Sequence, residues 1–331
     1  MRKKEFFYPS ADGIHQIHGI LWLPDGKWRQ APRGIVQIVH GMVEYVGRYE
    51  ELAHYLNGLG YVVAGNDHLG HGESVRSQEE WGYFSAGNGG ACMVKDMRRL
   101  TLLLQKRYSH VPCFLLGHSM GSFLTRQYLA VYGQQTDGAI LLGTGNHPAL
   151  LLRLGLFLTA MLKVCKGEHH KSPLLQKIMF GSYNRRISNP RFANDWVCGN
   201  EKVMEAYNKD PACTFLFTVN GVETLMKTLL FIGNRNNIEN VPKDMPILMA
   251  SGKEDPVGNY GKAVEKVYHM YREAGIRDIT LKLFEHCRHE LHNESNREDV
   301  YEMIGNWLDS RSVHRCPADH ERSGGMIEKE E

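Results

Sequence analysis

Short, almost wholly apolar runs alternate in this chain with longer segments of helical spacing, and this alternation restricts the fold more than any other feature. The apolar runs occupy residues 34–41, 61–66, 113–119, 138–143 and 246–252. Runs of this length without polar alternation are typical of strands buried on both faces of a sheet. Apolar residues recur at helical spacing between them, for example in 48–60, 93–108 and 122–132. The alternation therefore predicts an α/β fold with a mostly parallel sheet flanked by helices.

The alternation is interrupted over residues 146–241, which carry helical patterns and no clear strand pattern. This stretch is far longer than an ordinary connection. We therefore expect an inserted helical cap, with the core formed by residues 1–145 and 242–309. The segment from Glu5 to Leu23 predicts an antiparallel hairpin at the edge of the sheet. Residues 310–331 are polar and lack periodicity, so we expect a disordered tail there.

The composition argues against several functional classes. The chain has 331 residues, 42% of them hydrophobic, and a formal net charge of +2, so nucleic acid is not an expected partner. Seven cysteines without a CxxC pair indicate neither a disulfide framework nor a zinc site. No apolar segment follows the basic residues at the N-terminus, which predicts a cytoplasmic protein without a secretory signal.

The most apolar window, residues 150–162, is too short for a membrane span and contains Arg153. It predicts a buried or interfacial helix of the cap. A cap over an apolar pocket must present apolar side chains to the ligand, and such side chains can also face a membrane surface. We therefore keep two interpretations of this window: the interior of the cap, and a transient peripheral contact with a membrane.

The run at residues 113–119 ends in GHSMG, which fits the G-x-S-x-G pattern at the end of a strand and the start of a helix. A serine at so sharp a turn has a strained backbone, and Gly117 and Gly121 remove Cβ atoms that would collide there. The helix N-terminus behind Ser119 stabilises developing negative charge. Ser119 is therefore the candidate nucleophile. The alternative is a glycine-rich strand end without chemistry.

A serine nucleophile needs a base, a residue that orients the base, and donors for the oxyanion. Asp255 follows the run at residues 246–252, and HCRHELHNE after the strand pattern ITLKLFE offers His286, His289 and His292. The chain order serine, aspartate, histidine is that of α/β-hydrolases. The residues alone leave three histidines as candidates for the base.

Five segments in order resemble the monoacylglycerol lipase and lysophospholipase group of the α/β-hydrolases, which is often placed with the serine aminopeptidase-like hydrolases. They are HGMVEYVGRYEELAHYL, NDHLGHGES, GHSMGS, SGKEDPVG and FEHCRHELHNE, and the cap segment YNKDPACTF is similar as well. The resemblance covers most of the chain and implies the α/β-hydrolase fold. It implies that His289 is the base, that Asp255 orients it and that His286 is a surface residue. The oxyanion is expected to meet the backbone N–H groups of Met42 and Met120.

In this family the loop after the HG pair carries an acid and an arginine near the polar head of the substrate. The resemblance places these on Glu44 and Arg48, with His292 facing them. The alternative is that Glu44 and Arg48, four residues apart, pair with each other on a surface turn. Tyr45 stands where the family commonly has a histidine, which leaves the head-group preference open. The DHLGHG segment, residues 67–72, lacks a ligand pattern and predicts a structural loop rather than a metal site.

These patterns predict a serine hydrolase that needs no metal or cofactor and cleaves carboxylic esters of small lipid-like substrates, monoacylglycerols or lysophospholipids, through an acyl-enzyme. One alternative is a peptidase that removes N-terminal residues, for which Glu201, Glu205 and Asp210 of the cap would hold the free amine. Another is a ligand sensor that keeps the fold without catalysis. The sequence does not indicate the oligomeric state.

Overall fold

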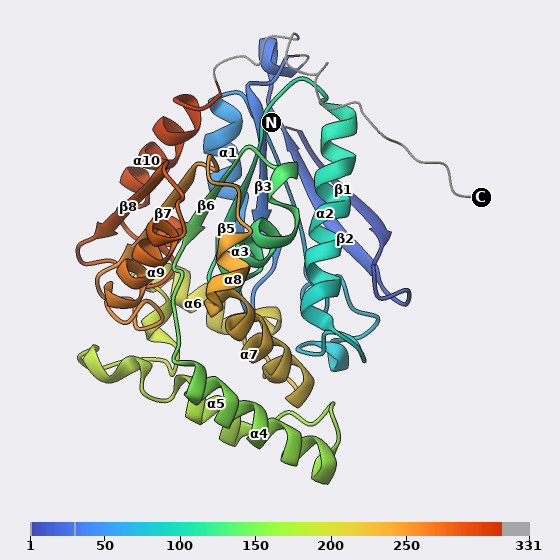
Figure 1. Ribbon diagram of the computed structural model, residues 1–331, viewed down its shortest axis with the longest axis vertical. Coiled ribbons are helices and arrows are strands. Elements are labelled where there is room, and N and C mark those ends of the chain that lie inside the picture. The colour runs from blue at the N-terminus through green and yellow to red at the C-terminus, as the bar shows by residue number, and fades with distance from the viewer. Residues whose placement is uncertain (1, 30, 313–331) are drawn as a thin grey trace.

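A computed structural model describes residues 2–29 and 31–312 of the chain. Figure 1 shows a central sheet covered by helices on both faces, with a further layer of helices beyond one end of the strands. The predicted tail begins at residue 310, and from residue 313 onward it lies outside the described residues.

The sheet has eight strands in the order β1-β2-β4-β3-β5-β6-β7-β8. β2 pairs antiparallel with both β1 and β4, and every other pair of neighbours is parallel. This confirms the predicted edge hairpin and the mostly parallel sheet. The strands are β1 (Arg2–Pro9), β2 (Gln16–Leu23), β3 (Gly34–Val39), β4 (Tyr61–Asn66), β5 (Cys113–His118), β6 (Gly138–Leu142), β7 (Ile247–Gly252) and β8 (Ile279–Phe284).

Five helices flank the sheet and account for the apolar character of its central strands. α1 and α10 pack on one face, and α2, α3 and α9 pack on the other. On β5, Leu115 joins the cluster under α2 and α3, whereas Leu116 joins the cluster under α1 and α10. Such a strand has no polar face, because both of its sides are buried. The helices are α1 (Glu50–Gly58), α2 (Gly89–Arg107), α3 (Met120–Tyr132), α9 (Lys262–Glu273) and α10 (Arg297–Asp309).

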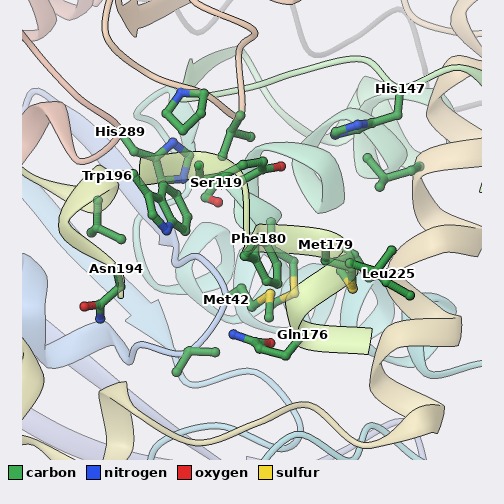
Figure 2. A pocket seen from close by; sticks show the side chains of 18 of the residues that line it. Met42, Ser119, His147, Gln176, Met179, Phe180, Asn194, Trp196, Leu225 and His289 are labelled. Carbon is green, nitrogen blue, oxygen red and sulfur yellow. The ribbon is translucent and has the colours of Figure 1, made fainter. Parts of the chain in front are cut away.

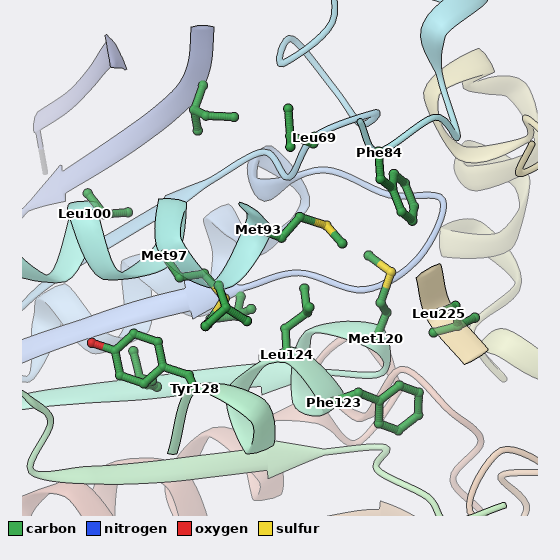
Figure 3. Close-up of a cluster of buried hydrophobic side chains, with 14 of the residues drawn as sticks. Leu69, Phe84, Met93, Met97, Leu100, Met120, Phe123, Leu124, Tyr128 and Leu225 are labelled. Carbon is green, nitrogen blue, oxygen red and sulfur yellow. The ribbon is translucent and has the colours of Figure 1, made fainter. Parts of the chain in front are cut away.

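Figure 3 shows the largest part of the core, where α2 and α3 meet. Met93, Met97 and Leu100 of α2 belong to the same buried cluster as Leu124 and Tyr128 of α3. This packing fixes the first turn of α3 against the end of β5, where the candidate nucleophile lies. The site is therefore held by the core itself and not by a surface loop.

The segment between β6 and β7 is described throughout and is built of helices without a named strand. α7 packs on α2 and α3, and its buried side chains belong to the same cluster as theirs. α4 packs on α7, and Figure 1 shows α4 and α5 at the outer edge of the molecule. The division of the chain after residue 145 and before residue 242 stays a prediction. The helices of the segment are α4 (Ala149–Lys166), α5 (Pro173–Phe180), α6 (Glu201–Lys209), α7 (Val219–Gly233) and α8 (Arg235–Glu239).

One face of α4 has no covering element within the described part of the chain. Val164 is 89% exposed, Leu150 71% and Phe157 66%. The predicted apolar window at residues 150–162 thus lies largely within a surface helix, with only Leu152 and Thr159 fully buried on α4. In the described residues, we find no helix whose length and apolar character would carry it across a membrane.

Candidate active site

Ser119 lies at the junction of β5 and α3, in a backbone conformation that serine rarely adopts. Its φ is 52° and its ψ is −122°. A Cβ on Gly121 would lie 1.9 Å from the carbonyl oxygen of Val39, and one on Gly117 would lie 2.5 Å from the carbonyl oxygen of Gly121. Both glycines are therefore required for the turn, which holds Ser119 in a strained position of the kind found at functional sites.

His289 and Asp255 form a buried pair. Nδ1 of His289 lies 2.9 Å from Oδ2 of Asp255, and the two side chains are 3% and 0% exposed. The Asp255 carboxylate also accepts hydrogen bonds from the Ser251 hydroxyl at 3.0 Å and the Val257 N–H at 2.8 Å. Because Nδ1 faces a carboxylate, it carries a proton and leaves Nε2 as the free acceptor. That Nε2 is buried and has no hydrogen-bond partner among the described residues.

Ser119 and His289 meet the end of β6 at neighbouring residues. The Ser119 N–H donates to the carbonyl oxygen of Leu142 at 3.0 Å. The His289 ring lies over Gly143, where an added Cβ would be 2.9 Å from the ring carbon Cε1. Because Leu142 and Gly143 are adjacent, both residues come to the same end of the sheet. Figure 2 shows Ser119 and His289 in one pocket.

The predicted oxyanion donors lie in the same place. Met120 is the first residue of α3, so its N–H has no carbonyl partner within the helix. Met42 lines the pocket on the opposite loop, and its neighbour Gly41 donates its own N–H to Glu44. The Glu44 carboxylate thereby holds the loop that contains Met42.

A pocket of about 820 Å³ opens around Ser119 and His289, within the size range of small-molecule sites. Trp196 borders it beside the catalytic candidates, with its ring centroid 5.3 Å from that of His289. Figure 2 places Met179 and Leu225 across the pocket from Trp196. Most of the wall is apolar, and its aliphatic part comes mainly from α4, α5 and α7: Leu151, Leu152, Leu154, Leu158, Ile178, Met179, Leu225, Met226 and Leu229.

Glu44 is the centre of a buried hydrogen-bond network. Its carboxylate accepts from the Gly41 N–H at 2.5 Å, from the Tyr49 hydroxyl at 2.9 Å and from Arg48 at 2.9 Å. His118 contacts the same carboxylate at 3.1 Å. Burial alone would raise the pKa of Glu44, but the hydrogen bond and charge of His118 and the charge of Arg48 hold it well below its usual range. Glu44 is therefore ionised.

His118 connects Glu44 to the candidate base. Its Nδ1 faces the Glu44 carboxylate at 3.1 Å, and its Nε2 faces the carbonyl oxygen of His289 at 3.3 Å. Both nitrogens face acceptors, so both donate only when the ring is an imidazolium. Burial lowers the pKa of His118, but the hydrogen bond and charge of Glu44 outweigh it and raise the pKa above its ordinary value.

Arg48 and His292, predicted near a polar head group, do not line the pocket, whereas Glu44 does. Arg48 donates to both oxygens of Glu290, at 2.5 and 2.7 Å, besides its bond to Glu44. His292 stacks on Tyr49 with ring centroids 4.5 Å apart. Burial, aided by the charge of His118, lowers the pKa of His292 to about 3, so its ring is neutral. The contact of these residues with a head group stays a prediction.

The carboxylates that a peptidase was predicted to use lie elsewhere. Glu201 and Glu205 lie 3.4 Å from Arg191 on the exposed face of α6. Asp210 accepts a hydrogen bond from the Tyr45 hydroxyl at 2.9 Å, and none of the three acidic residues lines the pocket.

The DHLGHG segment directly follows β4 and is held by hydrogen bonds of Asp67. The Asp67 carboxylate bonds to His18 at 2.8 Å and to the N–H groups of Val46 and Glu73. His68 packs on His40 with ring centroids 4.2 Å apart. The acid thus joins three segments of backbone, as a structural loop would.

Sequence reasoning missed two residues of this site. Glu290 follows the candidate base directly, yet its partner Arg48 is 242 positions away in the chain, and no local pattern links them. His118 stands inside the GHSMG motif at the variable position, so the motif gives it no role. The one signal available was a histidine at the end of an otherwise apolar strand that is buried on both faces.

Comparison with known proteins identifies the family of the chain. Residues 30–296 match the protein family described as serine aminopeptidase, S33. The chain is 27% identical to a monoglyceride lipase of Mus musculus over 309 residues, which cover 91% of this chain and 89% of that protein. It is 25% identical to a phospholipase of Bacillus subtilis strain 168, over 84% of this chain and 96% of that protein.

Among solved structures, a highly thermostable carboxyl esterase from Bacillus coagulans in complex with glycerol is 29% identical, with a TM-score of 0.87. The alignment covers 95% of this chain and 100% of the esterase. The match to the family extends over most of the chain, and its relatives and structural neighbours are esterases and lipases. The chain therefore has the α/β-hydrolase fold and belongs to the serine aminopeptidase S33 family, as an esterase- or lipase-like serine hydrolase of the monoglyceride lipase group.

Proposed function

We propose that the protein hydrolyses carboxylic esters of lipid-like substrates, with Ser119 as the nucleophile, His289 as the base and Asp255 as the residue that orients the base. One observation carries the proposal. The buried His289–Asp255 hydrogen bond leaves the Nε2 of His289 without a partner, in an apolar pocket that Ser119 also lines.

In the proposed reaction, Ser119 Oγ attacks the ester carbonyl while His289 Nε2 accepts the hydroxyl proton. The amides of Met42 and Met120 receive the oxyanion. His289 then gives the proton to the leaving alcohol, and the acyl group stays on Ser119. Water, deprotonated by the same ring, releases the fatty acid and restores the serine.

The pocket and the relatives support esters with an acyl chain as substrates. Aliphatic side chains of α4, α5 and α7 form one wall, which suits an apolar chain better than a peptide. A monoglyceride lipase and a probable lysophospholipase are both similar to this chain, so monoacylglycerols and lysophospholipids are the two candidate substrates. The acidic residues of α6 and Asp210 lie outside the pocket, so the carboxylates predicted to hold a free amine do not line the site.

Lengthening the acyl chain of a monoacylglycerol is expected to raise kcat/KM until the pocket is full. Each buried methylene contributes about 0.8 kcal/mol, which corresponds to an upper limit of about fourfold per carbon. We would measure kcat/KM for a series of rising chain length beside alanine-para-nitroanilide and proline-para-nitroanilide. A flat series, or faster cleavage of the amides, would promote the peptidase.

We propose further that the exposed face of α4 rests on a lipid surface when the enzyme takes up substrate. Leu151 and Leu154 are 59% and 58% exposed, and both also line the pocket. The same side chains thus belong to the outer surface and to the wall of the site. Arg153 and Lys166 are exposed on the same helix and can meet lipid phosphates.

Replacing Phe157 and Val164 together by serine is expected to weaken binding to phosphatidylcholine vesicles by about a hundredfold, because each exposed side chain contributes roughly 1.5 kcal/mol or more when buried in lipid. Vesicle sedimentation measures the binding. Turnover of a water-soluble ester, para-nitrophenyl butyrate, should be unchanged. Leu103→Ser is the control, since Leu103 is 52% exposed on α2. Equal loss in the control would contradict the assignment to α4.

A further inference from the structure

Two acidic residues, Glu44 and Glu290, line the polar end of the pocket, and both are bound to Arg48. No lysine or arginine is among the described residues that line the pocket. Glu290 follows the candidate base His289 directly. Because that base must give its proton to the leaving alcohol, the head of the substrate has to lie on this side.

Arg48 and His118 are the basic side chains that contact these acids in the described part of the chain. Arg48 Nη1 donates to both Glu44 and Glu290, and Arg48 Nη2 donates to the second oxygen of Glu290. The guanidinium carbon of Arg48 lies 4.7 Å from the ring centroid of Tyr207. Tyr207 itself lines the pocket. His118 uses both ring nitrogens on protein acceptors, one of them Glu44. Both side chains are therefore already engaged by an acid of the protein.

Glu290 is committed to this pairing by its surroundings. Its carboxylate is bidentate to Arg48, and Oε2 also accepts from the Asn293 side chain at 2.8 Å. Its backbone N–H donates to the carbonyl oxygen of Val197 at 2.7 Å. Burial raises the pKa of Glu290, but the charge and hydrogen bonds of Arg48 outweigh it and lower the pKa below the ordinary value. The acid is therefore charged wherever the enzyme works near neutral pH.

We propose that Glu290 is a specificity-determining residue, which holds Arg48 in a bidentate ion pair and thereby makes the site select neutral esters over esters with an anionic head. This rests on the proposed ester hydrolysis and decides between its two substrate classes. A phosphate at the head would lie beside two ionised acids that share the single guanidinium of Arg48, and like charges in a buried site repel strongly. A glycerol head carries no charge and meets only hydrogen-bonding groups.

The test compares monooleoylglycerol with lysophosphatidate that has the same oleoyl chain, so the substrates differ only in the phosphate. For the native enzyme we expect kcat/KM to favour the monoacylglycerol by about a hundredfold. Glu290→Gln removes one negative charge at nearly constant volume, and the ratio should fall by about tenfold or more. Because the readout is a ratio, a general loss of turnover next to His289 cancels.

Two further variants separate charge from fold. Glu294→Gln is the matched control: Glu294 is a buried acid of the same loop that accepts from the N–H groups of Gly199 and Arg288 and does not line the pocket. It should leave the ratio unchanged. Arg48→Gln combined with Glu290→Gln keeps the net charge and should restore selectivity toward the native value.

The outcomes are distinct. If the native enzyme cleaves both oleoyl esters equally well, or if Glu290→Gln folds and leaves the ratio unchanged, the role of Glu290 is overturned while ester hydrolysis stands. If Glu290→Gln does not fold, the kcat/KM ratios of the native enzyme and of the double variant decide whether the role of Glu290 stands. If the native enzyme cleaves neither lipid, the proposed function itself fails.

Discussion

Ser119→Ala is expected to abolish ester hydrolysis, with a fall in kcat that approaches the roughly 10⁶-fold loss seen when another serine hydrolase loses its nucleophile. Alanine keeps the Cβ that Ser119 already places in the turn at φ 52°, so the strain of the backbone is unchanged. The side-chain hydroxyl of Ser119 makes no hydrogen bond that holds the turn in the described structure. Activity should therefore vanish while the melting temperature stays close to that of the native protein.

The measurement is steady-state kinetics on a para-nitrophenyl ester, together with labelling by a fluorophosphonate. Ser77→Ala is the control, because Ser77 is exposed and does not line the pocket. The control should keep native turnover and native labelling. A folded Ser119→Ala protein that still hydrolyses the ester would remove Ser119 from the mechanism. A native protein that is never labelled would support the sensor on a hydrolase fold.

The sheet was predictable because burial on both faces leaves a simple mark in the sequence. GIVQIV and ILMASG have almost no polar residue, and both became central strands, β3 and β7. β8 lies at the edge and alternates between buried and exposed residues, so the same rule applies to it only in part. The segment between β6 and β7 was less predictable. Its helices pack on one another, and α7 joins the main core through contacts with α3 that no local pattern encodes.

The candidate site also has one part that the sequence predicts and one part that it does not. The turn at Ser119 is encoded locally, since two glycines and a strand end within five residues require it. Arg48 shows the opposite case. The expectation of an i, i+4 pair with Glu44 describes one of its bonds, at 2.9 Å, but the residue is buried and not on a surface turn. Its stronger, bidentate partner is Glu290, and only the folded loops bring the two together.

The buried hydrogen bonds of Glu44 and His118 connect two loops of the site. Glu44 fixes the loop with the Met42 amide through the Gly41 N–H, and His118 joins Glu44 to the backbone of His289. The loop that contains Met42 and the loop that contains His289 are thereby connected through Glu44 and His118 by buried hydrogen bonds. Such groups are costly to separate in a buried site, so the two loops keep a fixed distance.

His289→Ala is expected to be as damaging as Ser119→Ala, with a loss of about 10⁶-fold in kcat, because nucleophile and base act as one unit. Without the ring, no group accepts the proton of the Ser119 hydroxyl, and the Asp255 carboxylate does not line the pocket. Imidazole added to the variant should restore part of the rate, since it can occupy the space left by the ring. That rescue would not occur if the substitution had merely loosened the loop.

His286→Asn is the matched control for the base. The His286 side chain is 93% exposed and its φ is 55°, a conformation that asparagine tolerates better than most residues. Its nearest carboxylate is Glu254 at 3.6 Å, not Asp255. The control should therefore keep nearly native kcat on the same ester. If His286→Asn lost activity and His289→Ala kept it, the base would be His286. The buried pair of His289 with Asp255 would then be structural, since only one imidazole can stand between Ser119 and the acid that orients the base.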